Sequence, residues 1–93
     1  MEEKIMTLHP QRKKGVNILK RRYTVVKEFI LKEVDRIGEP TYGEVSDNAL
    51  KTLSATFDGK VVWYVVSVKL DLEARGILER VPKSSPHKIR RPI

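Results

Sequence analysis

The residues best suited to chemistry in this sequence are cations that gather near its two ends. Residues 1–22 hold seven Lys and Arg against two Glu, residues 77–93 hold five against one Glu, and the stretch between them holds seven against nine acidic residues. Each phosphate that a cation neutralises releases condensed counterions, so two basic ends favour a polyanion held from two sides. Solvated basic tails are the other interpretation of the same pattern.

Other kinds of site lack the residues they need. The two histidines, His9 and His87, stand far apart and the chain has no cysteine, so no set of three or four metal ligands is expected. The carboxylate pair Asp71/Glu73 falls in a helical pattern and is expected to be solvated. The sequence contains no nucleophile–base set, no phosphate-binding glycine loop and no nucleotide fingerprint. We therefore expect no enzyme, with no catalytic residue, metal, cofactor or evident small-molecule ligand.

The hydrophobic pattern predicts two helices, and the first of them begins within the basic N-terminal segment. Apolar residues recur at helical spacing over residues 18–37, and Gly38 and Pro40 end that helix. Thr41 and Glu44 form the two ends of a capping box, which opens a second helix over residues 42–53.

Residues 59–75 carry a mixed signal. Their apolar residues recur at steps of three and four as in a helix, yet β-branched and polar residues also alternate as in a strand. The length of the segment and the glycine at position 76 favour a helix. Residues 77–91 are then expected to form a two-stranded hairpin, or wing, and residues 1–17 an irregular basic arm.

The chain length of 93 residues provides a single hydrophobic core. We expect an α+β fold that is mostly α, with the arm at 1–17 and one domain over 18–93. The longest apolar run, Val61–Val66, is far too short to cross a bilayer, and the N-terminus lacks the apolar stretch of a signal peptide. A cytoplasmic protein with no membrane partner is expected.

The helix order and one local block resemble a known fold. Three helices followed by a basic hairpin, with the block Leu72-Glu73-Ala74-Arg75-Gly76-Ile77-Leu78-Glu79-Arg80, resemble the winged helix-turn-helix domain of multiple-antibiotic-resistance-repressor-type regulators. The stretch from His9 to Asn17 is also similar to small uncharacterised bacterial winged-helix proteins. The resemblance covers about residues 20–91. It implies that the helix 59–75 lies in or near the major groove of duplex DNA, with the wing on the neighbouring backbone.

Candidate DNA contacts come from three parts of the chain. Base reading relies on Arg, Lys, Asn and Gln in the recognition helix, and the helix 59–75 offers few of them, so phosphate contacts should dominate. The helix supplies Lys60, Tyr64 and Ser67; the wing supplies Lys83, Ser84, Ser85, His87, Lys88, Arg90 and Arg91; the arm and the start of the first helix supply Arg12, Lys13, Lys14, Arg21 and Arg22.

Trp63, Val66 and Leu70 need a different account, because they widen the apolar surface of the helix 59–75 beyond one stripe. Burial within the chain, under the N-terminal segment, is one account. A homodimer surface and a ligand pocket are the others.

The sequence thus predicts a DNA-binding protein, either a bacterial transcriptional regulator or a DNA-associated accessory factor, held on duplex DNA mainly by phosphate contacts. The alternative is a winged-helix protein–protein interaction or dimerisation module without specific DNA readout. RNA stays open as a partner, because phosphate contacts do not separate the two nucleic acids.

Overall fold

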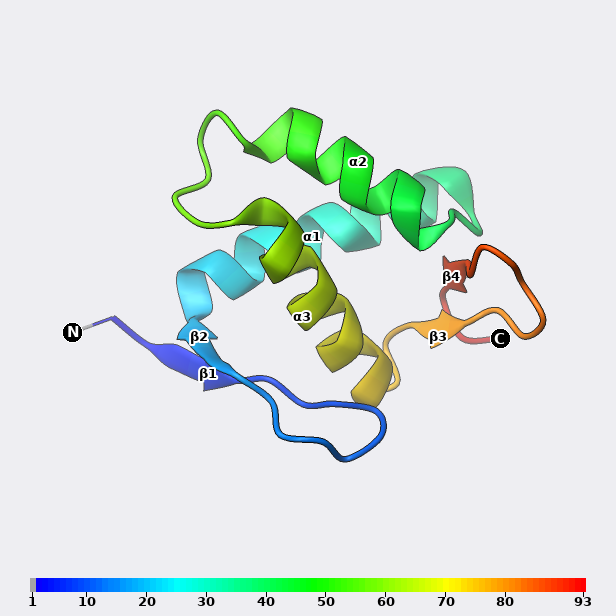
Figure 1. Ribbon diagram of the computed structural model, residues 1–93, viewed down its shortest axis with the longest axis horizontal. Coiled ribbons are helices and arrows are strands. Elements are labelled where there is room, and N and C mark those ends of the chain that lie inside the picture. Colours follow the sequence, from blue (N-terminus) through cyan, green and yellow to red (C-terminus); the bar gives the residue numbers. More distant parts are fainter. Residues whose placement is uncertain (1) are drawn as a thin grey trace.

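Three helices form most of the computed structural model of the chain, which describes residues 2–93, so position 1 of the predicted arm lies outside it. Helix α1 spans Lys20–Ile37, α2 spans Tyr42–Leu53 and α3 spans Val61–Ala74. Each end lies within two residues of its predicted position, and the mixed signal of the third segment resolves as a helix. Figure 1 shows α3 in front of α1, with α2 alongside.

Capping residues set the ends of α1 and α2 as the sequence predicts. Gly38 follows α1 with φ 98°, and its N–H donates to the Val34 carbonyl at 2.7 Å. The Glu44 N–H donates to Thr41 Oγ1 at 3.0 Å, while the Thr41 N–H donates to Glu44 Oε1 at 3.1 Å. These bonds satisfy backbone groups that a helix end leaves free.

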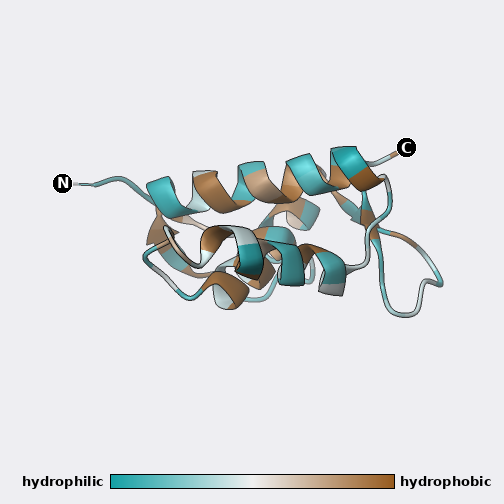
Figure 2. Ribbon diagram, turned by 90° about the horizontal axis from the view of Figure 1, so that it is seen from above, coloured by the Kyte–Doolittle hydropathy of each residue, from teal (hydrophilic) through white to brown (hydrophobic). Residues whose placement is uncertain are grey.

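The core lies where the apolar stripes of the three helices meet. Seen from above in Figure 2, the body is flat, 18 Å along its shortest axis, and hydrophobic and hydrophilic residues alternate along its helices. Within residues 2–93, no helix combines the length and the low polarity that crossing a membrane requires. The fully buried side chains on the three stripes are Val26, Ile30 and Val34 of α1, Val45 and Ala49 of α2, and Val65, Val68 and Leu72 of α3.

The N-terminal segment is a hairpin, so the prediction of an irregular arm over 1–17 is wrong. Strand β1, Lys4–Met6, pairs antiparallel with β2, Asn17–Leu19. The Thr7 N–H extends the ladder by donating to the Val16 carbonyl at 2.8 Å. We call residues 4–19 the N-terminal hairpin and residues 8–15 its loop. Strands this short leave almost no periodic signal in a sequence.

A second strand pair follows α3. Strand β3, Glu79–Arg80, pairs antiparallel with β4, Ile89–Arg90, and an isolated bridge joins Thr41 to Lys88. We call residues 77–91, the range predicted as a wing, the C-terminal hairpin. The molecule is therefore a small α+β domain of three helices, with one strand pair before them and one after.

Candidate functional site

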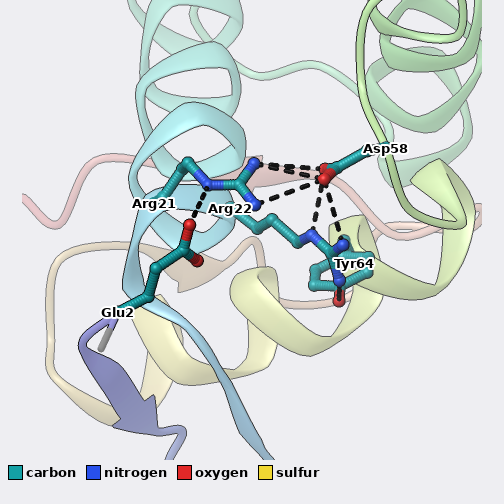
Figure 3. A network of polar contacts seen from close by, with 5 residues as sticks. All are labelled: Glu2, Arg21, Arg22, Asp58 and Tyr64. Carbon is teal, nitrogen blue, oxygen red and sulfur yellow. Dashed lines mark hydrogen bonds and ion pairs between the residues drawn. The ribbon is translucent and has the colours of Figure 1, made fainter.

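Asp58, in the loop before α3, holds the two arginines that begin α1 (Figure 3). Arg22 Nε lies 3.0 Å from Asp58 Oδ1, and Arg21 Nη2 lies 3.2 Å from Asp58 Oδ2. Arg22 also donates to the Tyr64 hydroxyl at 2.9 Å, and Arg21 Nε lies 3.4 Å from Glu2 Oε1. The two guanidiniums hold the pKa of Asp58 well below its usual range. Both arginines thus tie α1 to the start of α3 and are not free cations.

The two arginines at the end of the chain are paired as well. Arg90 Nε lies 2.6 Å from Glu79 Oε2 and its Nη1 lies 3.3 Å from Glu39 Oε2. Arg91 Nε lies 2.9 Å from Asp35 Oδ1, and this bond lowers the pKa of Asp35. These pairs fasten the C-terminal hairpin to α1 and to the turn that follows it.

The candidate site consists of the unpaired cations of the two hairpins and of the loop before α3. Within residues 2–93 they are exposed, and their side chains make no ion pair and no hydrogen bond, so they are available to an anion. Arg80 is not among the predicted contact residues but belongs with them; the signal for it is its position on the same hairpin as Lys83 and Lys88. The cations of the site are Arg12, Lys13 and Lys14 in the N-terminal loop, Lys60 before α3, and Arg80, Lys83 and Lys88 in the C-terminal hairpin; Lys4, Lys27, Lys32 and Lys51 also make no ion pair but lie elsewhere, on β1, α1 and α2.

The loop of the N-terminal hairpin and the C-terminal hairpin flank the same end of α3, its carboxyl end (Figure 1). On one side, the N-terminal loop and its three cations line an open concavity of about 620 Å³ with Glu73 and Ala74. On the other side, His87 of the C-terminal hairpin faces Lys69 and Glu73. Lys69 Nζ lies 2.7 Å from Glu73 Oε1, so this carboxylate already has a cation beside it.

Two residues predicted to contact DNA are turned into the protein. Tyr64 is only 8% exposed, and its hydroxyl accepts the bond from Arg22. His87 is half-buried and stacks on Tyr42 with ring centroids 5.5 Å apart. Burial, followed by the nearby Lys69, lowers the pKa of His87. The loop before α3 covers Tyr64, since Phe57 packs edge-on against its ring with centroids 5.1 Å apart.

The serines of the predicted site differ in their surroundings. The Ser84 hydroxyl donates to the Val81 carbonyl at 2.7 Å and accepts from the Lys88 N–H at 2.9 Å, so it shapes the turn. Ser85 is exposed and Ser67 is half-buried on α3.

Asp71 is buried, so the expectation that it is a solvated carboxylate is wrong. Its side chain is fully buried and accepts from the Tyr23 hydroxyl, from Arg75 Nε at 2.9 Å and from the Leu8 N–H at 2.8 Å. Burial and the bond to Asp71 raise the pKa of Tyr23 to about 12. An aspartate next to Leu72 of the core stripe was the only signal of this role.

The outer face of α3 is apolar and partly exposed. Val62 is 47% exposed and Trp63 is 43% exposed, so burial within the chain does not account for Trp63. Val66 and Leu70 are half-buried, and the N-terminal hairpin lies beside only the Leu70 end. The face offers Ser67 as its only hydrogen-bonding side chain near the middle of the helix.

Comparison with known proteins gives a family without an assigned activity. A family model described as "Family of unknown function (DUF6958)" matches residues 4–89, a range that takes in both hairpins and all three helices. No curated protein and no solved structure matches the chain. Within residues 2–93, His, Asp and Glu side chains form no group of three that could hold a metal ion.

Proposed function

We propose that this chain, which belongs to a family of unknown function (DUF6958), binds duplex DNA through the phosphate backbone. The observation that carries the proposal is the placement of the unpaired cations. Those of the N-terminal loop and those of the C-terminal hairpin flank the same end of α3. Two cation groups near one end of a helix suit a continuous polyanion better than two separate small anions.

The winged-helix arrangement is part of this proposal. Support comes from the order of three helices followed by a two-stranded hairpin, as in the multiple-antibiotic-resistance-repressor-type domains that the sequence resembles. In such a protein the C-terminal hairpin is the wing and its lysines contact phosphates. A transcriptional regulator or a DNA-associated accessory factor is the role that fits.

The outer face of α3 modifies how the DNA would be held. Because Val62 and Trp63 occupy the face that a recognition helix would turn to the bases, α3 offers few side chains that can form hydrogen bonds with bases in the major groove. Lys60 and Ser67 are the polar groups that remain. Contacts therefore come from the two hairpins and are insensitive to sequence.

A fluorescence anisotropy titration with a short labelled duplex at several salt concentrations tests the proposal. Affinity should fall steeply with salt, with a slope of about −0.9 for each phosphate neutralised. The double variant Lys83→Ala/Lys88→Ala should weaken binding to every duplex and flatten the slope by about one unit per lysine. Its matched control is Lys32→Ala/Lys51→Ala, which removes equal charge from exposed positions on α1 and α2.

Absence of binding at low salt would overturn the proposal, as would an equal loss of slope in the control variant. A hairpin RNA of the same length belongs in the same titration. Tighter binding of the RNA, with the same dependence on Lys83 and Lys88, would replace DNA by RNA as the partner.

A second candidate function rests on the exposed Trp63. An apolar helix face with a tryptophan at its centre is typical of a surface that binds protein. On this account the chain is an interaction module without specific readout of DNA. A Trp63→Ala variant that keeps its DNA affinity and loses a protein contact would separate this role from the first.

A further inference from the structure

The concavity that the N-terminal loop forms with Glu73 and Ala74 of α3 has a shape that contacts to a duplex backbone do not use. Its volume of about 620 Å³ lies within the range of about 300–1,000 Å³ that is typical of pockets for small ligands. A duplex presents a convex outer surface of phosphates and sugars. A phosphate bound at the rim therefore leaves the interior of the concavity open to a further group of the nucleic acid.

Two kinds of side chain line this concavity. Arg12, Lys13 and Lys14 provide three cations, which attract a phosphate. Met6 and Leu8 provide an apolar wall, and their side chains are 53% and 45% exposed. Apolar surface gains free energy when a partner removes it from water. A nucleotide offers both groups that this lining requires, a phosphate and a planar base with apolar faces.

The wall on α3 does not repel an anion strongly. Among the described residues that line the concavity, Glu73 is the one acid, and its Oε1 lies 2.7 Å from Lys69 Nζ. The Leu72 carbonyl at the end of the helix accepts the Ile77 N–H at 2.9 Å. The Glu73 carbonyl accepts the Gly76 N–H at 3.1 Å. Because these acceptors already have partners, the three cations of the loop dominate the charge of the site.

The loop is also held in place before any ligand binds. The Leu8 N–H donates to Asp71 Oδ1 at 2.8 Å, and the Asp71 side chain is fully buried. The Arg12 N–H donates to the His9 carbonyl at 2.9 Å and closes the turn within the loop. A loop whose backbone is already ordered loses less entropy on binding, which favours affinity.

We therefore propose that this concavity binds an unpaired nucleotide of a DNA strand, with the phosphate on the three cations and the base against Met6 and Leu8. The inference rests on the proposed function, because it adds to the phosphate contacts of the duplex a site for the strand where that strand leaves the duplex.

A lipid surface fits the loop less well than a nucleotide. A segment that binds a bilayer buries its apolar side chains among the lipids, so these side chains have to project outward. Here Met6 and Leu8 line a hollow, while the middle of the loop, residues 11–14, is polar.

Anisotropy titrations with a blunt duplex, and with the same duplex extended by a few unpaired thymidines, test this site. The native chain should bind the extended duplex about fivefold more tightly, which corresponds to about 1 kcal/mol for a partly buried base. An overhang of abasic units is the matched control, because it keeps the added phosphates and lacks the bases. It should show none of the gain that depends on the base.

Variants of Leu8 separate the apolar wall from the cations. Leu8→Ser should abolish the gain from the overhang and leave the affinity for the blunt duplex unchanged, because the three cations and the Leu8 N–H stay. Leu8→Met keeps an apolar side chain and should keep the gain. Leu50→Ser on α2 is the matched control, since Leu50 is 47% exposed and lies outside the concavity, and it should also keep the gain.

A photoactivatable thymine in the overhang gives a readout that needs no variant. In the native chain it should cross-link to the segment from Met6 to Pro10 or to Ala74, as peptide mass spectrometry would show. Cross-links to the outer face of α3 around Trp63 instead would overturn the inference.

Equal binding of the blunt, abasic and extended duplexes, with a steep salt dependence, would sink the inference and leave the proposed function in place. Absence of binding to the blunt duplex at low salt would overturn the proposed function. Binding of the extended duplex alone would then keep the concavity as a site for a single strand.

Discussion

At the scale of the residue, the ability of a cation to attract a polyanion depends more on its ion-pair partner than on its position in the sequence. Arg21 and Arg22 stand in a basic run, but Asp58 binds both, more than thirty residues further along. Because paired guanidiniums on a protein surface are already neutralised, they add little to the attraction of a polyanion. The carboxylate of Asp58 should therefore affect the stability of the protein rather than its binding of a polyanion.

Replacement of Asp58 by asparagine should lower the stability of the protein at neutral pH much more than in acid. The pKa of Asp58 is depressed in the folded state by Arg22 and Arg21, whereas an unfolded aspartate titrates near 3.9. The stabilisation is thus complete above about pH 4 and is lost as the pH falls from there toward the folded pKa. Urea midpoints at pH 6 and pH 3 measure this, with Asp47→Asn as the exposed control; a gap between native and variant that stays constant with pH would contradict it.

Gly15 is fixed by a backbone contact rather than by its own torsion angle. A Cβ at this position would lie 1.7 Å from the Thr7 carbonyl oxygen, across the N-terminal hairpin. Gly15→Ala should therefore destabilise the protein by about 1–3 kcal/mol, as overpacking does. At Gly43 of α2 a Cβ meets nothing closer than 3.9 Å, so Gly43→Ala should instead stabilise by roughly 0.5 kcal/mol. Thermal melts of the two variants should shift in opposite directions.

The sequence allowed the charge on each segment to be predicted but not the pairing of single residues. Counting places Arg90 and Arg91 in a basic end, while Glu39 and Asp35, one partner of each, are more than fifty residues away. No pattern of neighbouring residues can indicate a contact between residues so far apart in the sequence. The lysines and Arg12 of the loops make no ion pair; Glu73, which borders the N-terminal loop, is already paired with Lys69.

At the scale of the element, helices were predictable and short strands were not. The helices α1 and α2 have caps and stripes that local residues fully specify, such as Gly38 and the Thr41–Glu44 box. Each strand of the N-terminal hairpin has three residues, and the contact that fixes it involves Asp71, on another element. An element held by a distant partner leaves little in its own sequence.

The C-terminal hairpin should loosen in mild acid because of His87. This side chain stacks on Tyr42, and it faces Lys69 and Glu73 of α3 and Arg80 of β3. Burial and the two cations lower its pKa below the value of about 6.5 that an unfolded histidine has, so protonation opposes the fold. Its contribution is present above that unfolded value and is lost as the pH falls through the lower, folded pKa.

Amide hydrogen exchange at pH 7.5 and pH 5 measures this loosening. Protection of the Val81 and Ile89 amides should fall in acid in the native chain, since both donate hydrogen bonds that hold this hairpin. His87→Phe, which keeps an aromatic ring against Tyr42, should show no such fall. In His9→Gln, the matched histidine control in the N-terminal loop, the fall should persist; its disappearance there would refute the assignment to His87.

At the scale of the whole molecule, the N-terminal hairpin is part of the folded domain and not an arm attached to it. Ile18 is buried in the core, Thr7 is buried, and Asp71 joins Leu8, α1 and α3 through one carboxylate. The same hairpin presents the cations of its loop and borders the outer face of α3. Both proposed contacts thus depend on a segment that the sequence describes only as basic and irregular.

Removal of residues 1–17 should therefore cost much of the stability of the protein. The truncated chain 18–93 loses the Leu8 N–H, one of the three donors to the buried Asp71, and a hydrogen bond to a charged group contributes about 1.5–3 kcal/mol. It also loses the apolar contacts of Ile5 with the core, which contribute about 1–2 kcal/mol more. We expect a urea midpoint well below that of the full chain, or no folded state at all. A detachable arm would leave the midpoint unchanged, and that result would show that three helices and the C-terminal hairpin suffice for the fold.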